Sequence, residues 1–423
     1  MVEYEPRKDS TALTRTTSKV YTHRTNSCEL REGFVMNRKK VAILLPWLKM
    51  GGTNKVALRF AKELSQYCDV TLVLSQNTGE LLSEVPDGVH ILIDELRSFR
   101  DIFVEDIKNL SIEFLLKDIR YYANVRASRD DIDNYSYLAS RNPNISEETF
   151  DCAISYHGQS PERLVNLVDR IYARKKVVWI HGEMSFSDDF LKKMEKYYAQ
   201  VDHFFFVSKA TQDSFAKSVP FDTAKATVYY NPLDENEILT KASETPEQSF
   251  SSQTFNLLTV GRISTEKGQD MIPSIVQNLL DRGYPIHWYL IGDGPNQGKV
   301  ENLIQEHHVQ DYVSLLGVKN NPYCYMRMCD LYVQPSYTEG YSTTICEAGI
   351  LGKAIIGTKP SGGIRDQIMD GVDGLIVDAS IEGLTNGIES LLQNPALKMR
   401  FETEIRKKNF AGKGEVKKFL DIL

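Results

Sequence analysis

Short apolar runs alternate with helix-like segments through most of this 423-residue chain. The pattern begins with an apolar run at 41–46, continues through KMGGTNKVALRFAKELSQY and returns to an apolar run at DVTLVLS. Apolar runs without polar alternation are typical of parallel strands covered on both faces. The series continues at HILIDEL, DCAISYHG, KVVWIHG and HFFFVS. This order predicts an α/β fold with a doubly wound sheet.

A second series of the same kind begins at FNLLTVGR and runs through PIHWYLIGDGP, DLYVQPSY and KAIIGTKPSGG. The polar, Ser/Thr-rich stretch KASETPEQSFSSQT separates the two series, so we predict a linker over 233–254. We expect one domain over 36–232, a second over 255–400 and a helical tail over 401–423. Because ligands of doubly wound sheets bind beyond the carboxyl ends of the strands, the chemistry should lie in the cleft between the domains.

Two segments depart from this rhythm. Residues 1–35 are polar and without a period, which predicts a disordered leader, and Met36 could be an alternative translation start. The segment 99–149 is helical in pattern, and it carries five basic and two acidic residues between Lys108 and Arg129. Two interpretations remain open for this helical insert: helices packed on the sheet, or a face that meets anionic membrane lipid or a lipid-linked molecule.

Composition excludes several classes of partner. The net charge of −7 argues against nucleic acid as a general partner. No apolar run is long enough to span a bilayer and the polar N-terminus is no signal peptide, so we expect a cytoplasmic protein, with peripheral contact at the inner face of the plasma membrane as the option for the insert. The cysteines form no C-x-x-C pair and are predicted to be core thiols rather than disulfides or zinc ligands. They are Cys28, Cys68, Cys152, Cys324, Cys329 and Cys346.

Two loops that follow predicted strands carry residues suited to an anionic ligand. Gly51 and Gly52 precede a helix, where they would let a ligand approach the backbone, although a plain tight turn would use them equally well. The loop VGRISTEKG places Arg262 and Lys267 after the first strand of the second domain. A guanidinium and an ammonium group in this position could neutralise a diphosphate, or could simply be solvated.

A third loop, EGYSTTICEAG, places Glu339 and Glu347 eight positions apart. Eight helical residues rise by about 12 Å, so the carboxylates could hold two ends of one extended ligand but could not meet at one atom. The backbone N–H groups of 340–343, with the hydroxyls of Ser342 and Thr343, are expected to face a phosphate. Because carboxylates accept hydrogen bonds from hydroxyls, we predict a nucleotide diphosphate sugar. The alternative is that one glutamate complements the helix dipole and the other is solvated.

In combination these motifs resemble the retaining GT-B glycosyltransferases of family GT4, the glycosyl transferases group 1. Glu339 and Glu347 match the E-x7-E motif of that family, and the similarity extends over VGRISTEKG, LLGVKN, SGGIRDQI and DGVDGLIVD, which covers most of 255–380. The N-terminal half is similar more loosely, through LPWLKMGGTNKVALRFAKEL and WIHGEM. From Met36 onward the chain looks like bacterial enzymes that assemble capsule, exopolysaccharide or lipopolysaccharide glycans.

The resemblance implies a fold and a role for individual residues. It implies two Rossmann-like domains facing across a cleft, the first for the acceptor and the second for the donor. Arg262 and Lys267 would hold the donor diphosphate, Glu347 the ribose and Glu339 the hydroxyls of the donor sugar. His181 matches the histidine of the catalytic centre, so the implied catalytic residues are His181, Glu339, Arg262 and Lys267. The implied donor-binding residues are Gly51, Gly52, Arg262, Lys267, Gly317, Val318, Glu339, Gly340, Tyr341, Ser342, Thr343 and Glu347.

The implied reaction transfers a hexosyl group, with retention, from a nucleotide diphosphate sugar to a saccharide acceptor. By family habit the donor is a UDP-sugar, the acceptor is linked to polyprenyl diphosphate, and no metal or other cofactor takes part. Cations and a helix N-terminus would stabilise the leaving diphosphate more strongly in the transition state than in the ground state.

Three rival interpretations are weaker on sequence grounds. Asp131 and Asp133 match the D-x-D of metal-dependent transferases, but they lie in a charged segment instead of at a strand end. A sugar nucleotide epimerase would share the architecture, and the full E-x7-E with VGRISTEKG argues against it. A glycan-binding partner subunit without activity would commonly lack a diphosphate cation or a glutamate, and this chain retains all four.

Overall fold

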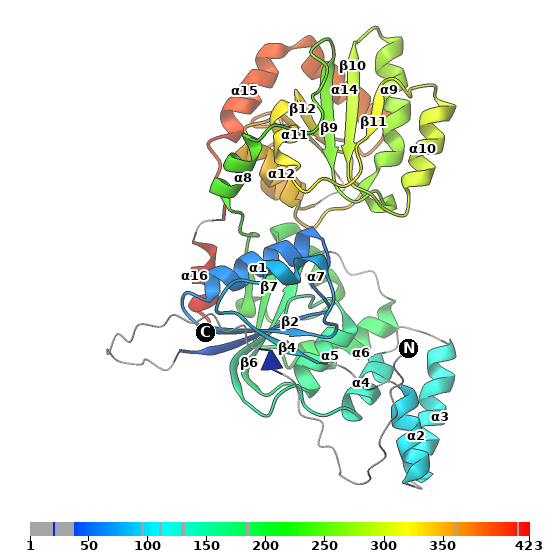
Figure 1. The fold of residues 1–423 in the computed structure, drawn as a ribbon, viewed down its shortest axis with the longest axis vertical. Coiled ribbons are helices and arrows are strands. Elements are labelled where there is room, and N and C mark those ends of the chain that lie inside the picture. The colour runs from blue at the N-terminus through cyan, green and yellow to red at the C-terminus, as the bar shows by residue number, and fades with distance from the viewer. Residues whose placement is uncertain are drawn as a thin grey trace, which may run out of the picture.

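The computed structural model describes residues 20–21, 38–94, 97, 99–109, 112–127, 132–182, 187–359, 362–412 and 414–423. They form two α/β domains, each built around one sheet (Figure 1). The predicted leader lies outside the described residues except for two of them, and Met36 and Cys28 lie outside them as well. The α/β architecture with two domains predicted from the sequence is confirmed.

The N-terminal sheet has the strand order β1-β4-β3-β2-β5-β6-β7-β8. Every neighbouring pair in it is parallel except β1 with β4. The strands are β1 Val20–Tyr21, β2 Lys40–Leu45, β3 Asp69–Leu74, β4 His90–Ile93, β5 Phe150–Ser155, β6 Ala173–Ile180, β7 His203–Phe206 and β8 Ala226–Val228. Along β2, Val41 and Ile43 belong to one core and Ala42 and Leu44 to the other. This alternation follows from the two-residue period of a strand and explains the uninterrupted apolar run.

Helices cover both faces of this sheet. Those of the N-terminal domain are α1 Gly52–Leu64, α2 Phe99–Lys108, α3 Ile112–Ala127, α4 Ile132–Ser140, α5 Pro161–Asp169, α6 Asp188–Tyr198 and α7 Lys209–Ser218, with 3₁₀ turns at Glu80–Glu84 and Thr223–Lys225. Phe60 of α1 packs in one core with Trp179 of β6, with ring centroids 5.0 Å apart. Leu164 of α5 and Met194 of α6 are buried in the other core.

The C-terminal sheet is parallel throughout, with the order β11-β10-β9-β12-β13-β14. Its strands are β9 Phe255–Val260, β10 Ile286–Ile291, β11 Val313–Leu315, β12 Leu331–Gln334, β13 Ile355–Thr358 and β14 Leu375–Val377. Its helices are α8 Glu235–Ala242, α9 Ile272–Asp281, α10 Gln297–Glu306, α11 Tyr323–Met328, α12 Thr343–Ile350, α13 Ile364–Gln367, α14 Ile381–Gln393 and α15 Pro395–Ile405, with 3₁₀ turns at Thr265–Lys267 and Gln269–Met271. Leu257 and Leu258 point into opposite cores, as in the first domain.

The domain boundaries differ from the sequence prediction at two places. Helix α8 lies inside the predicted linker, and its Ile238 and Ala242, four residues apart on one helix face, are buried in the core of the C-terminal domain. After α15, helix α16 (Glu415–Leu420) returns to the N-terminal domain, where Phe419 contacts Phe60 with ring centroids 5.4 Å apart (Figure 1). The chain therefore crosses between the domains twice, and its tail is part of the N-terminal core.

The helical insert has one part that is packed in the core and one part that is exposed. Helix α4 packs on α5, and its Ile132 and Ala139 are buried in the core. Helices α2 and α3 lie at the periphery of the N-terminal domain, away from the C-terminal domain (Figure 1). They expose the large apolar side chains of Val104, Ile107, Ile112, Phe114, Leu116 and Ile119. None of the helices in the described ranges is long and apolar enough to cross a membrane.

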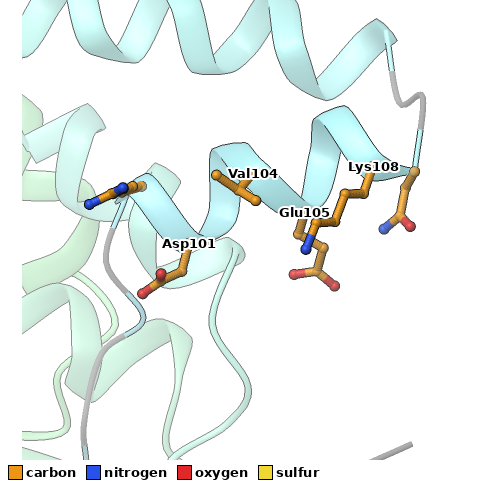
Figure 2. A pocket seen from close by; sticks show the side chains of 6 residues that line it. Asp101, Val104, Glu105 and Lys108 are labelled. Atoms are coloured by element: carbon orange, nitrogen blue, oxygen red, sulfur yellow. The ribbon is translucent and has the colours of Figure 1, made fainter. Parts of the chain in front are cut away.

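A surface hollow of about 480 Å³ lies along α2 (Figure 2). Acidic and basic side chains share it, and its lining residues are Arg100, Asp101, Val104, Glu105, Lys108 and Asn109. All of them belong to one helix and its end, and none comes from the loops that carry the predicted site residues. This hollow is therefore a feature of the insert rather than of the candidate site.

The described cysteines confirm the predicted core thiols. Cys68, Cys152, Cys324, Cys329 and Cys346 are all free and buried. Asp131 lies outside the described residues, whereas Asp133 forms ion pairs with Lys193 at 3.1 Å and Lys196 at 3.8 Å. Within the described part of the chain, no three His, Cys, Asp or Glu side chains are grouped so that they could hold a metal ion.

Candidate functional site

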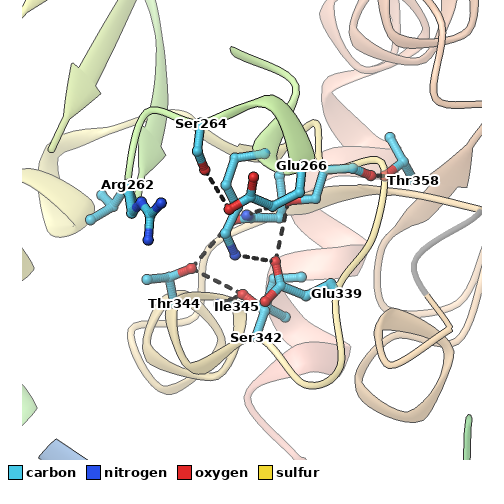
Figure 3. A network of polar contacts seen from close by, with 12 residues as sticks. Arg262, Ser264, Glu266, Glu339, Ser342, Thr344, Ile345 and Thr358 are labelled. Atoms are coloured by element: carbon cyan, nitrogen blue, oxygen red, sulfur yellow. Dashed lines mark hydrogen bonds and ion pairs between the residues drawn. The ribbon is translucent and has the colours of Figure 1, made fainter. Parts of the chain in front are cut away.

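The loop that follows β12 carries Glu339 into contact with the loop that follows β9. The Lys267 Nζ lies 2.5 Å from the Glu339 Oε2, and the hydroxyl of Ser336 donates to the same oxygen at 3.2 Å (Figure 3). Both charged side chains are largely buried. The structure thus brings together two predicted site residues that stand 72 positions apart in the sequence.

A glycine allows these two loops to approach closely. Gly268 adopts a φ of 68°, and a Cβ at this position would overlap with the carbonyl oxygen of Pro335 in the neighbouring loop. Gln269 further fixes the loop, because its side-chain amide donates to the carbonyl oxygen of Arg262 at 2.8 Å. The Arg262 residue itself is exposed beside this buried ion pair. A fixed loop with one paired and one exposed cation is suited to binding an anionic ligand.

The start of α12 differs in part from the sequence prediction. Ser342 is buried, its N–H donates to the Gln367 side chain at 3.1 Å, and its hydroxyl accepts from the N–H of Ile345 at 3.4 Å. Both polar groups are therefore used inside the protein, where Ser342 caps the helix instead of facing a ligand. Thr343 is directed at the other domain, because a Cβ on Gly52 would lie 3.5 Å from its hydroxyl oxygen.

Glu347 is buried, with only 9% of the residue exposed, so the alternative of a solvated helix residue is wrong. The Tyr323 hydroxyl donates to its Oε1 at 3.2 Å. Burial raises the pKa of Glu347 to about 7, whereas the charge of Arg59 in the N-terminal domain acts in the opposite direction. Glu347 thus carries a carboxyl group that titrates near neutral pH and is placed where the two domains meet.

His181 brings the N-terminal domain to the same place. It follows β6, and a Cβ at Gly340 would overlap with the His181 carbonyl oxygen, so the two loops are in backbone contact. The hydroxyl of Thr211 also reaches the carbonyl oxygen of Gly340 at 3.4 Å. These contacts place the end of β6 directly against the loop that carries Glu339.

The imidazole of His181 is held in an aromatic environment. Its ring lies 4.7 Å from that of Tyr156 and is stacked on Trp179 with centroids 6.3 Å apart. Burial lowers the pKa of His181 well below its usual value, and His157 lowers it further. The imidazole is therefore neutral at physiological pH, and its buried Nε2 has no hydrogen-bond partner among the described residues.

The remaining predicted residues lie at the ends of strands, as expected for ligand-binding loops. Gly51 and Gly52 precede and begin α1, and both are exposed. Gly317 follows β11, and its carbonyl oxygen accepts from the N–H of Gly292 at 2.9 Å. Val318 is exposed beside it, and Tyr341 contacts the ring of Tyr230 at 5.3 Å between centroids. Gly317 and Val318 thus mark the edge of the sheet, while Gly52 and Gly340 mark the domain interface.

Sequence reasoning missed the residues that surround Glu347. Arg59 of α1 and Tyr323 of α11 act on this carboxyl group, and Lys55 lowers its pKa as well. The spacing of Lys55 and Arg59, four positions apart on a helix whose other face is buried, was the signal available in the sequence. It indicated a basic helix face but could not indicate which surface this face meets.

Two cavities adjoin these contacts. The first, of about 600 Å³, lies in the N-terminal domain and is lined by Trp47, Gly51, Gly52, His157, Gln159 and Arg163 among others. The second, of about 300 Å³, lies between the domains and is lined by Lys55, Arg59, Glu237, Asn320 and Tyr323 among others. Gly52 joins the first cavity to the start of α12, because a Cβ there would lie 3.5 Å from the Thr343 hydroxyl oxygen. Tyr323, which lines the second cavity, donates a hydrogen bond to Glu347.

The two facing sheets, with these loops between them, have the fold of the GT-B glycosyltransferases. The fold is shared with Anabaena HepE in complex with UDP and glucose, with a TM-score of 0.66 and 16% identity over 91% of this chain and 100% of that one. It is also shared with sucrose-phosphate synthase from Thermosynechococcus elongatus, with a TM-score of 0.65 and 13% identity over 91% of this chain and 98% of that one. At these identities the likeness concerns the fold.

Residues 241–408 match the family described as glycosyl transferases group 1, and this segment contains Arg262, Lys267, Glu339 and Glu347. The matched segment covers most of the C-terminal domain.

Two curated proteins are similar to part of the chain. The chain is 26% identical over 205 residues to N-acetylgalactosamine-N,N'-diacetylbacillosaminyl-diphospho-undecaprenol 4-alpha-N-acetylgalactosaminyltransferase of Campylobacter jejuni, covering 47% of this chain and 53% of the relative. It is 25% identical over 240 residues to an uncharacterized glycosyltransferase of Haemophilus influenzae, covering 55% of this chain and 64% of the relative. The matches thus span between half and two thirds of the length of these relatives.

Proposed function

We propose that this protein is a retaining glycosyltransferase that moves a hexosyl group from a UDP-sugar to a saccharide acceptor in the synthesis of a cell-surface polysaccharide. The observation that carries the proposal is the Lys267–Glu339 pair at the domain interface, with Arg262 exposed beside it. A diphosphate requires positive charge, and a sugar requires hydrogen-bond acceptors such as carboxylates. These two requirements are met within one pair of adjoining loops.

The donor would lie along the C-terminal domain with its reactive end toward His181. Arg262 and Lys267 would bind the diphosphate, and their positive charge would stabilise the negative charge that grows on this leaving group as the glycosidic bond breaks. Glu339 would accept hydrogen bonds from the donor sugar, and Glu347 from the ribose. In the free protein Glu339 balances the charge of Lys267, so the arrival of a diphosphate would provide that cation with a second anionic partner.

The acceptor would enter from the N-terminal domain, through the 600 Å³ cavity that Gly52 joins to the donor loop. In the proposed step the acceptor hydroxyl attacks the anomeric carbon on the face that the diphosphate leaves. A phosphate oxygen of the leaving group takes the hydroxyl proton, so that the configuration is retained. The neutral imidazole of His181 can donate one hydrogen bond to the sugar without repelling the cationic carbon of the transition state.

We also propose that transfer proceeds without a bound metal ion. Arg262 and Lys267 supply two positive charges at the place where metal-dependent transferases use a divalent cation. The test is donor turnover after dialysis against a chelator, compared with turnover after magnesium or manganese is restored. Equal rates would support the proposal, and a rate that depends on the added metal would refute it.

The identity of the sugar, and the reaction itself, can be tested with a panel of donors. Purified protein would be incubated with UDP-, GDP- and ADP-sugars, with and without polyprenyl-diphosphate-linked saccharides, while nucleoside diphosphate release is measured. We expect release from one UDP-sugar that rises with an acceptor, and a product whose anomeric configuration matches that of the donor by NMR. Binding of a nucleotide without release under any condition would instead indicate a glycan-binding subunit, and interconversion of sugar epimers an epimerase.

A lipid-linked acceptor also requires access to a membrane, and we propose that α3 provides it. Ile112, Leu116 and Ile119 follow a spacing of four and three residues, so they share one helix face, and they are 73%, 64% and 59% exposed. Lys117 and Arg120 on the same helix are exposed as well. Apolar side chains flanked by cations are typical of a helix that lies in the interface of an anionic bilayer.

Vesicle co-sedimentation tests this membrane surface. Wild-type protein should sediment with phosphatidylglycerol vesicles, and less with phosphatidylcholine vesicles. The double variant Leu116→Ser and Ile119→Ser should remain in solution, because two exposed apolar contacts with lipid are lost. Met399→Ser is the matched control, because Met399 is 65% exposed on α15 of the other domain. Equal sedimentation of both variants would refute the assignment.

A further inference from the structure

Arg59 is the residue through which α1 of the N-terminal domain meets the polar groups around Glu347. Its side chain is only 18% exposed, and a guanidinium nitrogen lies 3.6 Å from the Oε2 of Glu237 on α8. Because α8 is packed into the core of the C-terminal domain, this ion pair joins the two domains. A buried arginine needs anionic or hydrogen-bonding partners, and Tyr323, Glu347 and Glu237, which act on Arg59, belong to the opposite domain.

The partners of Arg59 form a connected group around the buried carboxyl group. Arg59 interacts with the Tyr323 hydroxyl, and Tyr323 in turn donates to Glu347 at 3.2 Å. The charge of Arg59 also acts directly on Glu347 and on Glu237. We call this group, made of Arg59, Glu237, Tyr323 and Glu347, the interdomain cluster. Arg59, Glu237 and Tyr323 of this cluster line the 300 Å³ cavity between the domains.

Two opposite influences act on Glu347. Burial of the carboxyl group is the largest cause of its raised pKa. The positive charge of Arg59, which α1 contributes from the other domain, is the largest of the influences that lower this pKa. Lys55 of α1 acts in the same direction with a smaller effect, Tyr323 lowers the pKa by its hydrogen bond, and Glu237 raises it. The arginine therefore offsets part of the effect of burial on this carboxyl group.

We propose that Arg59 is a positioning residue that reaches across the domain interface and favours the ionised form of Glu347, so that the donor ribose meets a carboxylate although this group is buried. The inference rests on the proposed function, because it assumes that Glu347 binds the donor. The ionised carboxylate is an acceptor at both oxygens and suits two donating ribose hydroxyls, whereas the protonated form places a donor on one of these oxygens. Arg59 acts through Glu347 and takes no part in the chemical step.

The variants Arg59→Met and Arg59→Lys test this role. Methionine keeps much of the length and apolar contact of the side chain without its charge, and lysine restores the charge. Arg282→Met is the matched control. Arg282 forms an ion pair with Glu389 at 2.6 Å within the C-terminal domain, so this substitution removes an arginine ion pair that does not join the domains.

The first measurement is the radius of gyration of the ligand-free protein by X-ray scattering. We expect Arg59→Met, Arg59→Lys and Arg282→Met all to scatter like the wild type, because methionine keeps the apolar contacts of α1 and only the charge is removed. A more extended Arg59→Met would let water reach Glu347 and would overturn the inference.

The second measurement is the affinity for UDP by calorimetry between pH 6 and pH 9, with GDP and ADP as comparison ligands. Wild-type affinity should rise with pH as Glu347 loses its proton. In Arg59→Met the midpoint should move to higher pH, and a midpoint higher by about one pH unit weakens binding at pH 7 by several-fold, up to about tenfold. Arg59→Lys should restore much of the wild-type profile, and Arg282→Met should reproduce it.

The outcomes separate this inference from the proposed function. Wild-type protein that binds none of the three nucleotides would refute the proposed function, and the role of Arg59 with it. Wild-type protein that binds UDP, together with an Arg59→Met variant whose affinity and pH midpoint are unchanged, would refute only the role of Arg59. A merely structural role would weaken binding equally at every pH, and this result would also overturn the inference.

Discussion

Replacement of Glu347 by glutamine should make the protein more stable while it abolishes donor binding. Glu347 is buried and its pKa is raised from the ordinary value of 4.5 to about 7. Glutamine has nearly the same shape, stays neutral at every pH, and its carbonyl oxygen can still accept the hydrogen bond from Tyr323. The variant therefore mimics the protonated side chain permanently.

The size of the effect follows from proton linkage. The folded state holds the Glu347 proton more tightly than the unfolded state, so its stabilising effect is complete below pH 4.5 and is lost as pH rises to 7. A pKa difference of about 7 − 4.5, or 2.5, corresponds to about 3 kcal/mol at about 1.4 kcal/mol for each unit. Glu347→Gln should thus exceed the wild type in stability by about 1 kcal/mol at pH 5.5 and by about 3 kcal/mol at pH 8.5.

The assay is the melting temperature of both proteins across this pH range, without nucleotide. For a domain of this size 3 kcal/mol corresponds to about 6–12 °C. The gap between the two curves should widen with pH and level off above pH 7, while UDP raises the melting temperature of the wild type alone. A glutamine variant that is less stable than the wild type at pH 8.5, or a gap that does not depend on pH, would refute the reasoning.

Three further predictions concern the contacts around the donor loop. Lys267→Met should destabilise the protein by roughly 1–3 kcal/mol, because the Glu339 carboxylate loses its cation, and the added change Glu339→Gln should restore stability in urea unfolding without restoring transfer. Gly340→Ala should lower transfer by up to about a hundredfold, because the new methyl group overlaps with the His181 carbonyl oxygen and displaces the reacting ends of the two domains; an unchanged kcat would contradict this. His181→Ala should abolish transfer but keep calorimetric UDP affinity, and lost affinity would place this histidine in nucleotide binding instead.

The sequence predicted where most of the loops of the candidate site lie, because each motif follows a strand. Parallel strands present their carboxyl ends at one edge, so the loops with Gly52, Arg262 and Glu339 had to lie near the domain interface. The prediction for Ser342 failed in part. A serine before a helix can bind a ligand or cap the helix, and the sequence looks the same in both cases. The sequence therefore showed which polar groups are present in each loop, but not which partner each group binds.

The predicted linker failed for a related reason. A polar, Ser/Thr-rich composition describes most of the segment 233–254 correctly, but two apolar residues of α8, Ile238 and Ala242, are enough to fix a short helix on the core of the C-terminal domain. The return of α16 to the N-terminal domain was equally hidden, because Phe419 and Phe60 meet across most of the length of the chain. An apolar face in a sequence shows that something must cover it, without showing what does.

The sequence by itself determined the class of fold, the two domains and the charged loops, because hydrophobic period and strand-end motifs are local properties. Only the tertiary structure decided that Lys267 pairs with Glu339 and that Glu347 is buried. It also decided that Arg59 of α1 forms an ion pair with a residue of the other domain. These are the features that set the charge of the site. They depend on the relative placement of helices whose contacts lie far apart in the chain, and a carboxyl group acquires a pKa near neutrality only when that placement removes its water.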